Sequence, residues 1–133
     1  MDYVKYSFIA LVGWGIWAIG SKILTRYFNT LSTAFWISLW SILFLTALLV
    51  LRKNLVVNRF VLLSIPVGLI SMLAIVAFYG ALKSGPSSVV LPLTNLYVVL
   101  PVLFGFVVLK EPVTVARVLG VIFAVIAAVL LTL

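Results

Sequence analysis

The sequence predicts an all-helical, polytopic membrane protein: a bundle of five transmembrane helices in one domain over residues 1–133. Of its residues, 66% are hydrophobic and only 8% are charged, and the mean hydropathy is +1.42, whereas soluble domains carry about 25% charged residues. The apolar residues form five runs, each close to the ~20 residues that cross a hydrocarbon core. Because backbone groups in lipid must be paired internally, these runs are expected to be helices.

The first two spans are expected at 4–23 and 33–51. The first run is longer than the apolar part of a signal peptide and lacks a small-residue cleavage pattern, so it is expected to remain as a span. The break "RYFNTLST" offers Asn29 and Ser32 or Thr33 as turn and cap residues.

The other three spans are expected at 60–82, 88–109 and 114–133. The break "RKNLVVNRF" combines three charges with two asparagines, and "KSGPSS" joins Gly85 to Pro86. In "KEPVT", Pro112 follows a helix end and Thr114 is the expected N-cap of the last helix. All of the breaks are short, so sequential helices should form antiparallel hairpins.

The ionisable residues exclude several function classes. The chain has nine Lys and Arg against two Asp and Glu, a net charge of +7, but the basic residues are scattered near the ends of the apolar runs and indicate topology and lipid headgroup contacts. With no Cys and no His, we expect no metal site and no cofactor. Asp2 and Glu111 lie outside the spans, so we expect neither a buried carboxylate for proton coupling nor an enzyme.

Small residues recur at helix-packing spacing in the first and last spans. Packing within the bundle is favoured over a dedicated dimer face. The residues are Gly13, Gly20 and Ser21 in the first span and Gly120, Ala124 and Ala128 in the last.

Polar and aromatic residues of the first span are candidate site residues, because polar groups inside a membrane are costly. In "WGIWAIGSK", Trp14 and Trp17 are about one turn apart and Lys22 lies near the end. Either Trp17 packs and Lys22 extends to the headgroups, or Lys22 points inward and offers a cation to an anionic substrate group.

The segment "LPLTNLYVVLP" carries two prolines inside the fourth span. Pro92 and Pro101 each remove a backbone donor, and kinked helices of this kind commonly line transporter cavities. Helical geometry places Thr94, Tyr97 and Pro101 on one stripe and Asn95 some 200° from Tyr97. One set is expected to line a substrate path while the other links helices; alternatively, Asn95 and Tyr97 only join helices.

Glu111 is expected to have a structural role. A carboxylate just before the last helix can accept its first N–H groups and interact favourably with its dipole.

Several of these residues give the chain a resemblance to the EamA domain of the drug/metabolite transporter superfamily. "WGIWAIGSK" is similar to the first-helix pattern of that family, and the segment from "YGALKSGPSS" to "VIAAVLL" is similar to its second half. The matching residues are Trp14, Gly15, Lys22, Tyr79, Ala81, Leu82, Lys83, Pro92, Leu93, Glu111, Thr114 and Gly120. Val98 follows Tyr97 where many relatives have a proline, so the kink is expected nearly one turn later.

The resemblance implies a secondary transporter subunit that moves a small organic solute, such as a metabolite, amino acid or drug-like compound, by alternating access. The alternative is a non-transporting membrane subunit of a lipid-linked sugar flippase or another complex. The expected substrate-binding residues are Trp14, Trp17, Lys22, Tyr79, Thr94, Asn95 and Tyr97, and the expected structural residues are Pro92, Pro101, Glu111 and Gly120.

The resemblance also implies partners, because relatives usually carry two such halves and this chain carries one. We expect a dimer of inverted halves, as a homodimer or as a heterodimer with a paralogue, in the plasma or inner membrane. Loop charges favour a cytoplasmic N-terminus and an external C-terminus by six basic residues to three.

Overall fold

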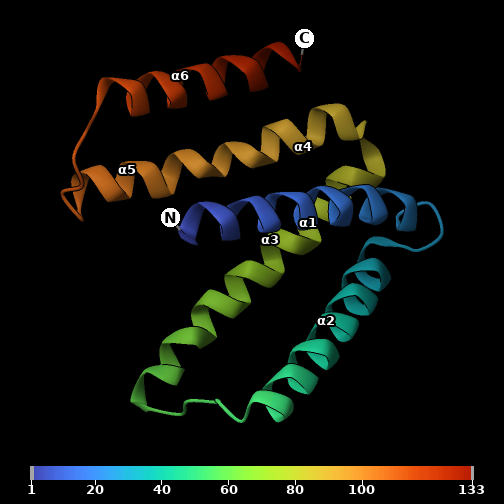
Figure 1. The fold of residues 1–133 in the computed structure, drawn as a ribbon. Helices are drawn as coiled ribbons and strands as arrows, with labels where there is room; N and C mark the ends of the chain where they lie inside the picture. The colour runs from blue at the N-terminus through green and yellow to red at the C-terminus, as the bar shows by residue number, and fades with distance from the viewer. Residues whose placement is uncertain (1, 133) are drawn as a thin grey trace. The chain divides into compact units, whose positions relative to one another are not determined.

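Helices account for every regular element among residues 2–132, the residues that the computed structural model describes (Figure 1). The chain divides into two units, one ending at Ser84 and the other beginning at Gly85, and each is described by itself. The all-helical class predicted from composition and hydropathy is therefore confirmed.

The first unit contains three long helices, α1 (Asp2–Leu24), α2 (Thr30–Arg52) and α3 (Ser64–Ser84), and the short 3-10 helix η1 (Arg59–Leu63). Asn29 is the N-cap of α2: its side chain accepts a hydrogen bond from the N–H of Ser32 at 2.7 Å, as the sequence predicted. Helix α2 therefore begins three residues before the expected start of that span. Asn58 caps η1 in the same way through the N–H of Phe60, at 2.9 Å.

Helices α2 and α3 form an antiparallel hairpin, and α1 contacts α3 (Figure 1). The buried residues of this unit are confined to the end of α1, the start of α2 and the end of α3: Ala18, Ser21, Thr25, Thr33, Ala34, Tyr79 and Leu82. By contrast, residues 40–74 are exposed apart from the half-buried Leu49. The three helices therefore share a small core at one end and present apolar side chains to lipid or to a partner elsewhere.

The second unit contains an interrupted helix and the last helix. Helix α4 (Ser87–Asn95), the 3-10 turn η2 (Leu96–Val98) and α5 (Val99–Val107) follow one another, and α6 (Val115–Leu130) contacts α4 and η2 (Figure 1). The sequence predicted one kinked span here. Pro101 lies four residues after Tyr97, whose carbonyl would meet the proline ring in a regular α-helix, and the tighter turn lies at that place.

Helix α6 begins where the sequence predicted, with Thr114 as its N-cap; the Thr114 side chain accepts from the N–H of Arg117 at 3.4 Å. The expectation that Glu111 would cap this helix is wrong. The N–H of Glu111 instead donates to Gly105 O at 3.0 Å. Its carboxylate lies beside Gly105 on α5, so a Cβ added at that glycine would be 3.2 Å from Glu111 Oε2.

Four segments are long and apolar enough to cross a membrane: Asp2–Leu24, Thr30–Arg52, Arg59–Ser84 and Ser87–Val107. They correspond to the first four predicted spans. Helix α6 has 16 residues, which extend about 24 Å at 1.5 Å per residue and fall short of a hydrocarbon core of about 30 Å. The described helix is thus shorter than the last predicted span, 114–133, whose final residue lies outside the described residues.

Candidate functional site

Three aromatic rings meet where α1 contacts α3. The rings of Trp17 and Phe78 are stacked, with centroids 5.4 Å apart and planes 13° apart. Tyr79 is tilted against both partners, 6.0 Å from Trp17 and 5.7 Å from Phe78. We call Trp17, Phe78 and Tyr79 the aromatic cluster. It brings together two of the predicted site residues and adds Phe78, which no sequence motif singled out.

Polar groups are buried beside the aromatic cluster. The Tyr79 hydroxyl has Ser21 and Trp17 as its polar neighbours, and Ser21 is only 1% exposed. The Ser21 hydroxyl nevertheless makes no hydrogen bond of ordinary geometry within the described residues. Ser21 had been noted from the sequence only as a small packing residue. The Tyr79 hydroxyl is therefore the polar group nearest to hand for Ser21, and the two buried hydroxyls lie together beside the aromatic cluster.

The two lysines near the ends of α1 and α3 bind backbone carbonyls. Lys22 Nζ is half-buried and donates a hydrogen bond to Leu82 O in the last turn of α3. Lys83 Nζ donates to Phe28 O at 3.4 Å and is exposed. A cation at a helix C-terminus interacts favourably with the helix dipole and the open carbonyls. Lys22 therefore joins α1 to α3, a role that neither sequence alternative described.

The Trp14 side chain is more exposed than that of Trp17 in the aromatic cluster. It is 65% exposed, against 36% for Trp17 one turn later. Within residues 2–84 it has no ring contact with the aromatic cluster. As positioned here, Trp14 faces lipid, a partner or a solute rather than the core of its own unit.

The other three predicted substrate-binding residues belong to the second unit. The Thr94 hydroxyl donates to Val90 O at 2.7 Å and Leu91 O at 3.1 Å, so it is satisfied inside α4. Asn95 is exposed at the end of α4, and Tyr97 is 59% exposed within η2. The amide of Asn95 has no hydrogen-bond partner among residues 2–132. The sequence did not decide whether Asn95 or Tyr97 faces a cavity, and neither side chain makes a hydrogen bond within the described residues of this unit.

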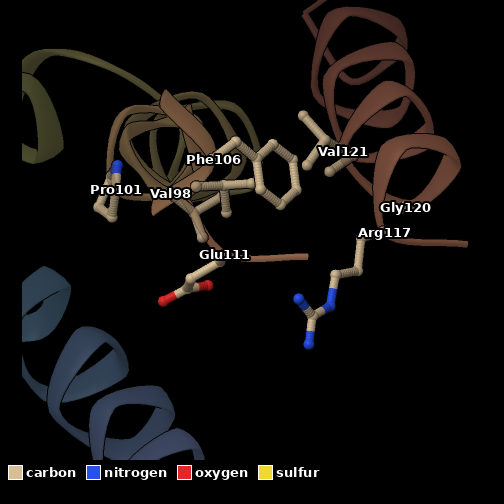
Figure 2. Close-up of a pocket in the computed structure, with 9 residues that line it drawn as sticks. Val98, Pro101, Phe106, Glu111, Arg117, Gly120 and Val121 are labelled. Atoms are coloured by element: carbon tan, nitrogen blue, oxygen red, sulfur yellow. The ribbon is translucent and has the colours of Figure 1, made fainter. Parts of the chain in front are cut away.

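A groove of about 560 Å³ lies between η2–α5 and α6, and we call it the α5–α6 groove. Figure 2 shows the Glu111 and Arg117 side chains extending on the same side of it without touching each other. Three of the four predicted structural residues, Pro101, Glu111 and Gly120, line it; Pro92 does not. The complete lining is Val98, Pro101, Val102, Phe106, Glu111, Arg117, Gly120, Val121 and Ala124.

Arg117 also lines the groove, although the sequence indicates for it only a share in the loop charges that set topology. In the structure its Nη1 donates to Pro112 O at 2.8 Å, across the loop before α6. Its place in the groove follows from the N-cap at Thr114, which sets Arg117 in the first turn of α6. The three-residue spacing of Thr114 and Arg117 can be read from the sequence. Which face of α6 lies against α5 cannot.

These features define a class: a multi-pass helical membrane protein with polar groups in its spans and an interrupted helix. The chain belongs to the EamA-like transporter family, whose match covers residues 3–133, and the resemblance seen in its motifs is confirmed. Members of this family are membrane transporters of the drug/metabolite transporter superfamily and not enzymes. Searches among curated proteins and among solved structures returned no match.

Proposed function

We propose that this chain is one half of a secondary transporter that moves a small organic solute by alternating access. The family provides the general activity of membrane transport. The solute class and the alternating-access mechanism are our proposal. They are supported by the interrupted helix of the second unit and by the polar groups on it.

Asn95 is the observation that carries the proposal. It is the ninth residue of the 21-residue apolar segment Ser87–Val107, near the middle of a span. An amide moved into hydrocarbon without a hydrogen bond costs about 2–7 kcal/mol, and Asn95 has no such bond in its unit. The residue therefore needs a water-filled cavity, a solute or a partner helix, and a break between two half-helices is a common place for a transporter site.

The site residues keep distinct roles in this proposal. In the second unit, Asn95 hydrogen-bonds the solute and Tyr97 contacts its apolar part; in the first unit, Trp14 and Trp17 offer aromatic surface to an apolar group. Tyr79 lends its hydroxyl beside Ser21, and Lys22 adds positive charge near the end of α1. Thr94 is the weaker hydrogen-bonding candidate, because its hydroxyl is already bonded to two carbonyls of α4.

The proposal includes a second EamA-like half, because the inverted-repeat architecture described for transporters pairs two halves of opposite orientation. The preferred assembly is a homodimer of inverted halves, with a heterodimer of oppositely oriented paralogues as the other form. Loop charges favour a cytoplasmic N-terminus. Six basic residues lie on the N-terminal side, Lys5, Arg52, Lys53, Arg59, Lys110 and Arg117, against Lys22, Arg26 and Lys83 on the other.

A metabolite screen followed by transport assays tests the function. Purified protein is first screened by thermal shift to find a stabilising solute, and uptake of that solute is then measured in reconstituted vesicles. Asn95→Ala and Trp14→Ala should reduce uptake at least severalfold. Asn54→Ala is the matched control, because Asn54 lies in the exposed loop before η1 and should not affect transport.

Two results would contradict the proposal. Unchanged uptake in both site variants would refute the assignment of Asn95 and Trp14 as substrate-binding residues. A protein that no solute stabilises, and that copurifies with a glycolipid enzyme, would instead be a non-transporting subunit.

A further inference from the structure

We propose that the α5–α6 groove binds a phospholipid with a primary-ammonium headgroup, of the phosphatidylethanolamine type. Its phosphate is held by Arg117, its ammonium by Glu111, and an acyl chain lies along the apolar part of the groove. This groove lies within the second unit and includes none of the proposed substrate-binding residues, and it does not depend on the transport proposal.

The two charged residues lie where lipid headgroups lie. Glu111 belongs to the loop between α5 and α6, and Arg117 to the first turn of α6, so both are at the ends of apolar helices. Neither is committed to the other: the structure places no ion pair between them within residues 85–132. Figure 2 shows the carboxylate and the guanidinium as two separate groups that do not meet.

Both groups retain unused binding capacity. Glu111 makes no side-chain hydrogen bond among the described residues, although its oxygens can accept several. Arg117 uses Nη1 for Pro112 O and keeps the other guanidinium donors, whose planar arrangement suits a phosphate. Gly105 allows the carboxylate to lie close to α5, because a Cβ there would meet Glu111 Oε2 at 3.2 Å.

Away from the charges, the groove is apolar. Val98, Val102 and Phe106 recur every four residues on one side, and Val121 and Ala124 lie on the other. The seven residue steps from Arg117 to Ala124 rise about 10 Å along α6. A free amino acid or headgroup would leave this length empty, whereas an acyl chain attached to the headgroup fills it.

The charge arrangement selects among lipids. The net charge of +7 by itself favours anionic lipids such as phosphatidylglycerol. Glu111 reverses that preference locally, because a carboxylate attracts an ammonium and repels an anion. Phosphatidylcholine has the same net charge as phosphatidylethanolamine, but its quaternary nitrogen has no N–H to donate to Glu111.

Competitive lipid binding tests the proposal. The full-length protein, purified in detergent and delipidated, is incubated with equimolar phosphatidylethanolamine, phosphatidylglycerol and phosphatidylcholine, and the retained lipid is quantified by mass spectrometry. We expect phosphatidylethanolamine to be enriched about threefold to tenfold over each competitor, the range of one exposed charge-assisted hydrogen bond. Retention of phosphatidylglycerol above phosphatidylethanolamine, or equal retention of all three lipids, would overturn the proposal.

Variants separate the two charges. Glu111→Gln should abolish the preference for phosphatidylethanolamine over phosphatidylglycerol while lipid retention continues, and Arg117→Gln should lower retention of both. Arg59→Gln is the matched control: Arg59 lies in η1 with its guanidinium 5.0 Å from the Phe60 ring centroid, outside the groove. An unchanged preference in Glu111→Gln would contradict the assignment.

A last comparison uses wild-type protein and distinguishes the lipid from a soluble zwitterion. O-phosphoethanolamine carries the headgroup charges without acyl chains, and leucine carries an ammonium and a carboxylate. Neither should displace bound phosphatidylethanolamine at millimolar concentration. Displacement by either one would assign the groove to a soluble zwitterion and overturn the lipid proposal. Because this test uses wild-type protein, it remains decisive if a variant fails to fold.

Discussion

Lys22 Nζ donates a hydrogen bond to the carbonyl oxygen of Leu82, sixty residues further along the chain. The bond joins the last turn of α1 to the last turn of α3, next to the buried Ser21 and Tyr79. A carbonyl in the last turn of a helix has no N–H partner within that helix, so the lysine satisfies an acceptor and places positive charge at the negative end of the α3 dipole. Lys22 thus contributes to the small core of the first unit as well as to the charge near it.

Replacing this lysine should destabilise the protein. Lys22→Met keeps much of the apolar length and removes the donor, and we expect a loss of about 1–2 kcal/mol, the contribution of a half-buried charge-assisted hydrogen bond. Thermal unfolding in detergent measures it. Lys83→Met is the control: the Lys83 contact with Phe28 O is longer, 3.4 Å, and exposed, so its effect should be smaller. Equal effects in the two variants would contradict the distinct role of Lys22.

The aromatic cluster predicts unequal effects for the two tryptophans of α1. Trp17→Ala removes the stack on Phe78 and the contact with Tyr79, and should cost about 1–3 kcal/mol. Trp14→Ala, at a side chain that is 65% exposed, should change stability by less than about 0.5 kcal/mol. The comparison is made by thermal unfolding in the same detergent. A larger loss in Trp14→Ala would show that its face is covered by a partner.

Two lysines adopt the left-handed conformation, one at the C-cap of α2 and one in the loop between α5 and α6. Lys53 has φ 49° after α2, and Lys110 has φ 53° after α5. This conformation strains a residue with a Cβ, and helices usually place glycine there. Lys53→Gly should therefore be more stable than Lys53→Ala by about 0.5–1 kcal/mol in thermal unfolding. Both variants lose the same charge, so only the backbone differs; a less stable glycine variant would refute the argument.

The sequence predicted local features better than contacts between helices. Asn29 and Thr114 were expected as caps because a capping side chain bonds within three residues. The left-handed backbone at Lys110 in the loop after α5 was not expected, since glycine usually adopts that conformation, and the chain then places Glu111 beside Gly105 rather than on α6. The pairing of Trp17 with Phe78 depends on which faces of α1 and α3 meet. Nearly uniform apolarity around both helices hides that choice from sequence periodicity.

Cysteine labelling tests the orientation and the inverted assembly. The chain has no native Cys, so single substitutions give unambiguous signals. Ser32 lies in the first turn of α2 and Asn54 in the loop after that helix, at opposite ends of one span. With a cytoplasmic N-terminus in most copies, Asn54→Cys should label mainly from the cytoplasmic face and Ser32→Cys mainly from the external face. An inverted homodimer requires a second population of copies in which both preferences are reversed, so each site should also label partly from the other face. Crosslinking of the purified protein then reports whether the two copies associate.

If each site labels from one face only while the purified protein crosslinks as a homodimer, the inverted homodimer is refuted and a parallel dimer replaces it. If each site labels from one face and only a monomer is recovered, the homodimer is refuted in both its inverted and its parallel form.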